Sequence, residues 1–174
     1  MIDSTVIRAH PCAAGAKKTD GTGGQDEQAL GRSRGGFGTK IYGGVSGLGL
    51  PVKLILTPGQ AADVTQAKAL IEDVPIEVVI DDKGYDSRAV VEVIEAVIPS
   101  QKDRKVQRSH DRDRYKDRNL VERFWFKLKQ YRRVATRYEK AARNFMGFIM
   151  VASIMVLLRP RHLPGRCPRN LAAA

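Results

Sequence analysis

The order of strand-like and helix-like runs along the chain constrains its fold more than any other feature of the sequence. MIDSTVIRA is rich in β-branched residues and predicts a strand that starts almost at Met1, and TKIYGGV and LPVKLILTPG predict a hairpin joined at SGLG. Asp63 then opens a predicted helix, with Gln66 completing a capping box. IEVVIDD predicts a buried strand, RAVVEVIEA a helix, AVIPS a short strand, and the residues from there to 158 further helices. This order predicts an α/β fold: a mixed sheet flanked by helices.

The length of 174 residues suits one domain with its own core. We expect that domain to span 1–158, with a long mobile loop at 13–38, where Gly and polar residues dominate, and a disordered tail at 159–174. The longest apolar run, at 145–158, is shorter than the ~20 residues needed to span a bilayer, so we interpret it as a buried core helix and expect no membrane contact.

The two cysteines, Cys12 and Cys167, lie near opposite ends of the chain and have no metal-ligand spacing. This usage fits a reducing compartment, and we expect a cytoplasmic protein. His10 and Cys12 could form a metal-binding pair, but two ligands do not make a site.

The net charge of +11 is concentrated in one part of the chain. Residues 101–143 contain 16 of the 30 Lys and Arg residues but only 6 of the 19 Asp and Glu residues. A basic region of this kind most often binds nucleic acid, because each phosphate neutralised by Lys or Arg releases counterions. A membrane surface or a solvated face remains an alternative.

Within this basic region, YKDRNLVERFWFKLKQ at 115–130 predicts an amphipathic helix. At about 100° per residue, four polar residues fall within an arc of about 60°. These are Tyr115, Arg118, Glu122 and Lys129. The opposite side is apolar and is expected to pack on the core. Its residues are Leu120, Val121, Phe124, Trp125 and Leu128.

Glu122 has two possible roles on such a cationic stripe. It could form an ordinary surface ion pair with Arg118 or Lys129. It could instead bind a divalent metal, because Mg²⁺ takes carboxylate oxygens together with substrate phosphates. The second role requires further carboxylates at strand ends. Asp3 in the first strand is one candidate, and either Asp81 or Asp82 at the end of IEVVIDD is the other, since alternation along a strand points those two to opposite faces.

The sequence resembles the DDE transposases of bacterial insertion sequences, specifically the insertion sequence five branch. The resemblance runs from residue 2 to about 158 and rests on motifs that occur in order. These are IDSTVIRAH, GRSRGGFGTKI, LPVKLILTPGQAAD, DDKGYDS, AVIPSQKDRK and YKDRNLVERFWFKLKQYRRVATRYEK. In that family the glutamate helix carries a Tyr, Arg, Glu, Lys signature, and Tyr115, Arg118, Glu122 and Lys129 match its spacing at every step.

The resemblance implies a ribonuclease H-like fold in which two aspartates and a glutamate bind two Mg²⁺ or Mn²⁺ ions. By position, Asp3, Asp82 and Glu122 are the expected catalytic and metal-binding residues, which favours Asp82 over Asp81. The expected contacts with the DNA backbone are Tyr115, Arg118, Lys129, Arg132, Arg133 and Arg137. The implied activity is cleavage and strand transfer of DNA at element ends and target, by a homo-oligomer on DNA.

Three features depart from the family pattern. Asp81 stands where a small residue is usual, and GGVSG replaces a bulkier strand, so the hairpin is expected to be loose. The family's N-terminal DNA-recognition region is expected to be absent, because Asp3 is only two residues from the start. We interpret the chain as the downstream frame of a two-frame transposase, with an upstream frame as fusion partner, or as an inactive remnant that binds DNA nonspecifically. A simple metal-dependent nuclease of the same fold is a further alternative.

Overall fold

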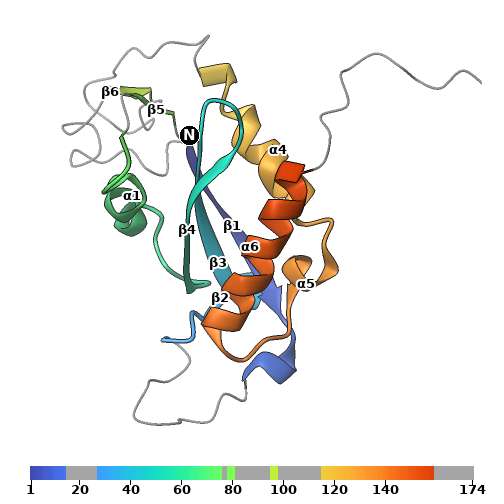
Figure 1. Ribbon diagram of the computed structural model, residues 1–174. Coiled ribbons are helices and arrows are strands. Elements are labelled where there is room, and N and C mark those ends of the chain that lie inside the picture. Colours follow the sequence, from blue (N-terminus) through green and yellow to red (C-terminus); the bar gives the residue numbers. More distant parts are fainter. Residues whose placement is uncertain (15–26, 76–77, 81–94, 98–114, 159–174) are drawn as a thin grey trace, which may run out of the picture.

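The computed structural model describes residues 1–14, 27–75, 78–80, 95–97 and 115–158. Its main sheet is mixed, and helices cover both of its faces (Figure 1). The chain therefore has the expected α/β architecture. The expected helix at 88–96 falls mostly outside the described residues, and its last two positions belong to a strand instead.

Three long antiparallel strands form the centre of the main sheet. β1 (Ile2–Ala9) pairs with β3 (Gly36–Val45), and β3 pairs with β4 (Pro51–Pro58). These are the expected first strand and hairpin, and the hairpin is paired along seven positions rather than loose, with a bulge between Gly44 and Val45.

Shorter strands complete the two sheets. β2 (Gly31–Ser33) pairs with the start of β3, and β7 (Thr136–Arg137) runs parallel to the end of β1. β5 (Val78–Ile80) and β6 (Glu95–Val97) form a separate parallel pair.

The expected loop at 13–38 is wrong in its second half. Residues 31–33 form β2, and β3 already begins at Gly36, two residues before the loop was expected to end. Short 3-10 helix η1 (Pro11–Ala14) also falls partly within it, while 15–26 lie outside the described residues. The glycine-rich sequence shows no alternation of apolar and polar residues here. Strands form nevertheless, because the hydrogen bonds between strands join backbone groups and do not depend on side chains.

The helices divide between the two faces of the sheet. α1 (Val64–Ile71) packs on one face, while α4 (Asn119–Leu128), α5 (Arg132–Ala135) and α6 (Ala142–Leu158) lie on the other (Figure 1). Alternation along β1 separates the two sides: Ile2 joins the α1 cluster and Ile7 joins the cluster under α4 and α6.

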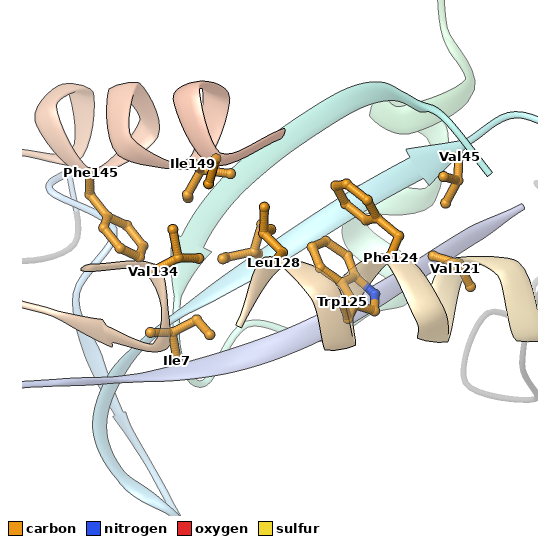
Figure 2. Packing of buried hydrophobic residues seen from close by; sticks show 11 residues of the cluster. Ile7, Val45, Val121, Phe124, Trp125, Leu128, Val134, Phe145 and Ile149 are labelled. Carbon is orange, nitrogen blue, oxygen red and sulfur yellow. The ribbon is translucent and has the colours of Figure 1, made fainter. Parts of the chain in front are cut away.

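The larger core lies between the sheet and the three C-terminal helices (Figure 2). The apolar side of α4 supplies Val121, Phe124, Trp125 and Leu128, all buried, as the helical periodicity predicted. Phe145 and Ile149 of α6 meet Val134 and Ile7 in the same cluster. Because this side of α4 packs on the core, the residues on its other side, including Glu122, face away from the core.

The prediction of a buried core helix at 145–158 is only half right. One side of α6 is buried, but the other carries several exposed apolar residues. In the part of the chain that the structure describes, no helix is both long and apolar enough to cross a membrane.

Asp63 precedes α1 but does not cap it through its side chain. Its carboxylate instead accepts a hydrogen bond from Ser4 Oγ at 2.7 Å and pairs with Lys40 Nζ at 2.7 Å. The nearby Tyr42 hydroxyl donates to the Ala61 carbonyl at 3.1 Å. Burial, and then the charge of Asp63, raise the pKa of Tyr42 to about 12. The expected capping box is therefore wrong, because a tertiary ion pair across the sheet holds the carboxylate.

Gly43 in β3 makes room for the indole of Trp125. A Cβ placed at Gly43 would lie 2.7 Å from Trp125 Cη2 and 3.2 Å from Leu54 Cδ2. We expect Gly43→Ala to lower the free energy of unfolding by about 1–3 kcal/mol, because a buried ring must move. Urea denaturation followed by circular dichroism measures this loss. Gly47→Ala is the matched control, since nothing lies within 4 Å of its Cβ position; equal stability of both variants would contradict the packing argument.

Candidate active site

The site is built on the face of β1 that looks toward α4. Asp3 is on the same face of β1 as Ile7 and opposite Gly43, whose Cβ position meets Trp125 of α4. Alternation of side chains therefore points Asp3 at the helix that carries Glu122, and away from α1.

Arg118 joins the two carboxylates. Its Nη1 donates to Glu122 Oε1 at 2.6 Å, one turn along the helix, and its Nη2 lies 3.8 Å from Asp3 Oδ1. The Asp3 side chain is 16% exposed and that of Glu122 is 53% exposed. A half-buried and an exposed carboxylate thus share one guanidinium.

The electrostatics of Asp3 reflect its burial. Loss of water contact raises its pKa above the ordinary 3.8, and the nearby charge of Glu122 raises it further. The Ser4 N–H, the charge of Arg118 and the Trp125 indole N–H all act in the opposite direction. The indole contact is loose: Trp125 Nε1 is buried without a hydrogen bond of ordinary geometry. Asp3 is therefore a carboxylate with incomplete compensation for its charge.

Asp82, the second expected metal ligand, lies outside the described residues, as does Asp81. β5 ends at Ile80, directly before them. Among the described segments, no three His, Cys, Asp or Glu side chains gather closely enough to bind a metal ion. The structure thus brings together Asp3 and Glu122 and leaves the third position undescribed.

The helix around Glu122 is shorter than expected. α4 begins only at Asn119. A turn at Asp117 and Arg118 separates α4 from the helical residues Tyr115 and Lys116. Glu122 and Lys129 are exposed as expected, whereas Tyr115 is half-buried and the Arg118 side chain is only 20% exposed. The Arg118 guanidinium reaches toward Asp3, with Nη2 3.8 Å from Asp3 Oδ1.

The remaining expected DNA contacts differ in their surroundings. Arg132 is exposed at the start of α5. Arg133 is also exposed, but it pairs with Glu139 at 2.9 Å and lies over the rings of Tyr138 and Phe148. Its guanidinium already has protein partners, so Lys129 and Arg132 are the better placed cations for a phosphate.

Arg137 does not have the surroundings of a DNA contact. It is fully buried in β7, and its guanidinium donates to Thr39 Oγ1 at 2.6 Å and to the carbonyls of Ala29, Glu139 and Lys140. Burial lowers its pKa to about 10, against the opposing charge of Glu139. A phosphate has no access to this group, so we withdraw Arg137 from the DNA contacts and assign it a structural role.

The exposed pair His10 and Cys12 remains a pair in the structure. His10 Nδ1 lies 3.1 Å from Cys12 Sγ, and the imidazole stacks on Tyr138 with ring centroids 5.1 Å apart. No third ligand joins them among the described residues.

A family model described as "Transposase DDE domain" matches residues 1–157. This chain belongs to that family. The DDE transposase domain therefore accounts for almost all of the described residues, including β1 with Asp3 and α4 with Glu122. The resemblance to transposases of insertion sequences is confirmed, while the branch within them stays a prediction.

One relative of this DDE transposase domain comes from Brucella ovis (strain ATCC 25840 / 63/290 / NCTC 10512) and is named "Putative transposase for insertion sequence element IS6501". It is 35% identical over 128 residues, which cover 70% of this chain and 98% of the relative. No solved structure matches the chain.

Proposed function

We propose that this chain is the catalytic domain of an insertion-sequence transposase that cleaves DNA phosphodiesters and transfers the cut strand. The observation that carries the proposal is the placement of Asp3 and Glu122 around Arg118, on one face of the sheet of a DDE transposase domain. Asp82 is the proposed third carboxylate.

The topology is compatible with a ribonuclease H-like arrangement. β1, β3 and β4 form an antiparallel unit, a helix follows on one face, and the parallel pair β5 and β6 comes next in the chain. We propose that Asp82, which follows the end of β5, completes the carboxylate set, since open α/β sheets build their sites at the carboxyl ends of strands.

The donor set suits a hard divalent cation such as Mg²⁺ or Mn²⁺. Asp3 and Glu122 offer oxygen ligands, and the raised pKa of Asp3 shows that its negative charge lacks full compensation by the protein. Asp3, Glu122 and Asp82 would hold a pair of ions. Bound there, the ions would supply activation of water or a 3′-hydroxyl and stabilisation of the leaving oxygen in a phosphodiester displacement.

The protein's own residues position the DNA. Arg118 pairs with Glu122 and lies 3.8 Å from Asp3, and its guanidinium would offer a phosphate oxygen a charged donor beside these two carboxylates. Lys129 and Arg132 lie exposed along the same helical region and fix the backbone without reading sequence. The proposed substrates are the element ends and the target DNA.

Removal of divalent metal tests this function. We expect the chain to nick supercoiled plasmid and to join an element-end oligonucleotide to it in Mn²⁺, and to do neither in EDTA, because carboxylates alone cannot activate the nucleophile. Gel electrophoresis separates nicked from joined products. Nicking without joining would indicate a simple nuclease. DNA binding that is salt-dependent but produces no metal-dependent cleavage would indicate an inactive remnant that only binds.

A further inference from the structure

The outer side of α6 is an exposed apolar surface, here called the α6 outer face. Its members all have between about four and seven tenths of their side chains exposed. They are Phe148, Met150, Val151, Ile154, Met155, Leu157 and Leu158. The opposite side of the same helix is buried through Phe145, Ile149, Ala152 and Ser153.

This surface is large, and α6 itself contributes no charge to it, although the guanidinium of Arg133 from α5 lies over the ring of Phe148. From Asn144 to Leu158 the helix has no Asp, Glu, Lys or Arg, although the chain carries a net charge of +11. The seven side chains leave on the order of 700 Å² of apolar area exposed, which exceeds the ~300–600 Å² of the largest patch on a typical monomer. Isolated exposed apolar residues need no explanation, but a contiguous half-helix does.

The spacing of the residues is that of a helix-packing seam. Phe148, Val151, Met155 and Leu158 recur at steps of three, four and three, the pattern by which two helices interlock. Near the start of the face, a Cβ at Gly147 would meet nothing within 4 Å, so another helix can approach closely there.

We propose that the α6 outer face is the dimer interface of this chain and that its occupant is a second copy of the same face. Two strongly cationic molecules repel wherever their charged surfaces meet, and α6 from Asn144 onward brings no charged side chain of its own into the contact. An isologous contact needs a self-complementary surface, which an uncharged seam of this spacing provides. The ~700 Å² per copy is close to the ~800 Å² per partner of a standard interface.

The proposal does not depend on the metal site. The contact uses no residue of the catalytic carboxylate cluster and forms without DNA or cation. Its failure would leave the proposed cleavage reaction untouched, and loss of cleavage would leave the dimer untouched.

Sedimentation velocity of the nuclease-treated full chain in EDTA and high salt tests the dimer. We expect the wild type to sediment as a dimer and the double variant Val151→Glu, Met155→Glu to be a monomer, with association at least about ten-fold weaker, because glutamates in the seam would be desolvated on contact. Both positions are exposed, so the circular dichroism spectrum should match that of the wild type and show that the variant folds.

Leu48→Glu is the matched control, since Leu48 is 67% exposed on the loop between β3 and β4 and does not belong to the α6 outer face. It should remain dimeric. A monomeric wild type would overturn the proposal and leave another segment or partner as the occupant of the face. A double variant as dimeric as the wild type would also overturn it.

Disulfide trapping tests the identity of the interface in a second way. In a Cys12→Ser, Cys167→Ser background, Ile154→Cys lies at the middle of the α6 outer face and should form a disulfide-linked dimer on mild oxidation. Thr65→Cys on the exposed side of α1 should not. Equal cross-linking at the two positions would show random collision and contradict a defined interface.

Discussion

Replacing Arg137 with alanine is expected to leave the chain largely unfolded under conditions in which the wild type is folded. The guanidinium is fully buried and bonds to Thr39 Oγ1 and to three backbone carbonyls at 2.6 to 3.2 Å. It also lies over the ring of Phe145, 5.2 Å from its centroid. This one side chain therefore ties β7 to β3, to the segment before β2 and to the start of α6.

The expected loss is large because several acceptors in and near the interior lose their donor, although the Ala29 carbonyl keeps the Thr39 hydroxyl. Each buried acceptor without a partner costs about 1–3 kcal/mol, and the volume vacated by the side chain adds a cavity cost. The sum is comparable to the ~5–15 kcal/mol total stability of a domain. Urea denaturation followed by circular dichroism gives the free energy of unfolding.

Two further variants separate hydrogen bonding from other effects. Arg137→Met keeps much of the volume but no donor, and should be nearly as unstable as alanine. Arg132→Ala removes an exposed arginine five residues away and should change stability by less than about 0.5 kcal/mol. If Arg137→Ala lost no more stability than Arg132→Ala, the buried bonds would not be structurally important.

Arg137 also shows what sequence could not reveal. It belongs to a basic region in which neighbouring arginines are exposed, and charge counting treats all of them alike. Burial of one of them depends on acceptors from separate parts of the chain: the Thr39 hydroxyl of β3, the Ala29 carbonyl before β2 and the Glu139 and Lys140 carbonyls after β7. The contacts with Thr39 and Ala29 join positions about 100 residues apart, so no local pattern indicates them.

Elements with strong periodicity were predictable, and elements held by distant partners were not. β1, the hairpin and the apolar side of α4 follow from alternation and helical spacing. The cap at Asp63 failed because Ser4 and Lys40 compete for its carboxylate. Hydropathy identified α6 as apolar, yet it could not show that one side would lack a partner within the described part of the domain.

The site was partly predictable for the same reason. The motif spacing identified Asp3 and Glu122, and the fold places both beside Arg118. The helical arc placed Arg118 outward with Glu122, whereas its side chain is only 20% exposed and its guanidinium lies 3.8 Å from the Asp3 carboxylate. The choice of Asp82 over Asp81 as the third carboxylate stays a prediction, because both residues lie outside the described part of the chain.

The second prediction with a large expected effect concerns nicking activity and the carboxylates of Asp3 and Glu122. We expect Asp3→Asn and Glu122→Gln each to reduce Mn²⁺-dependent nicking by at least 10²–10³-fold, more than the 10–100-fold usual for an outer-shell partner of a metal. Each amide keeps the shape of the side chain but removes an anionic oxygen ligand. A time course of plasmid nicking at saturating Mn²⁺ measures the change. Glu72→Gln, an exposed glutamate beside α1 on the other face of the sheet, should nick at the wild-type rate.

Stability distinguishes a catalytic role for Asp3 from a structural one. Because folding raises the pKa of Asp3, its protonated form favours the fold below about pH 3.8, and this contribution is lost as the pH rises through the folded-state pKa. At neutral pH and without metal, Asp3→Asn should therefore be at least as stable as the wild type while being inactive. A variant that lost activity and stability together would show that Asp3 holds the fold. An active Glu122→Gln would show that Glu122 is only the ion-pair partner of Arg118.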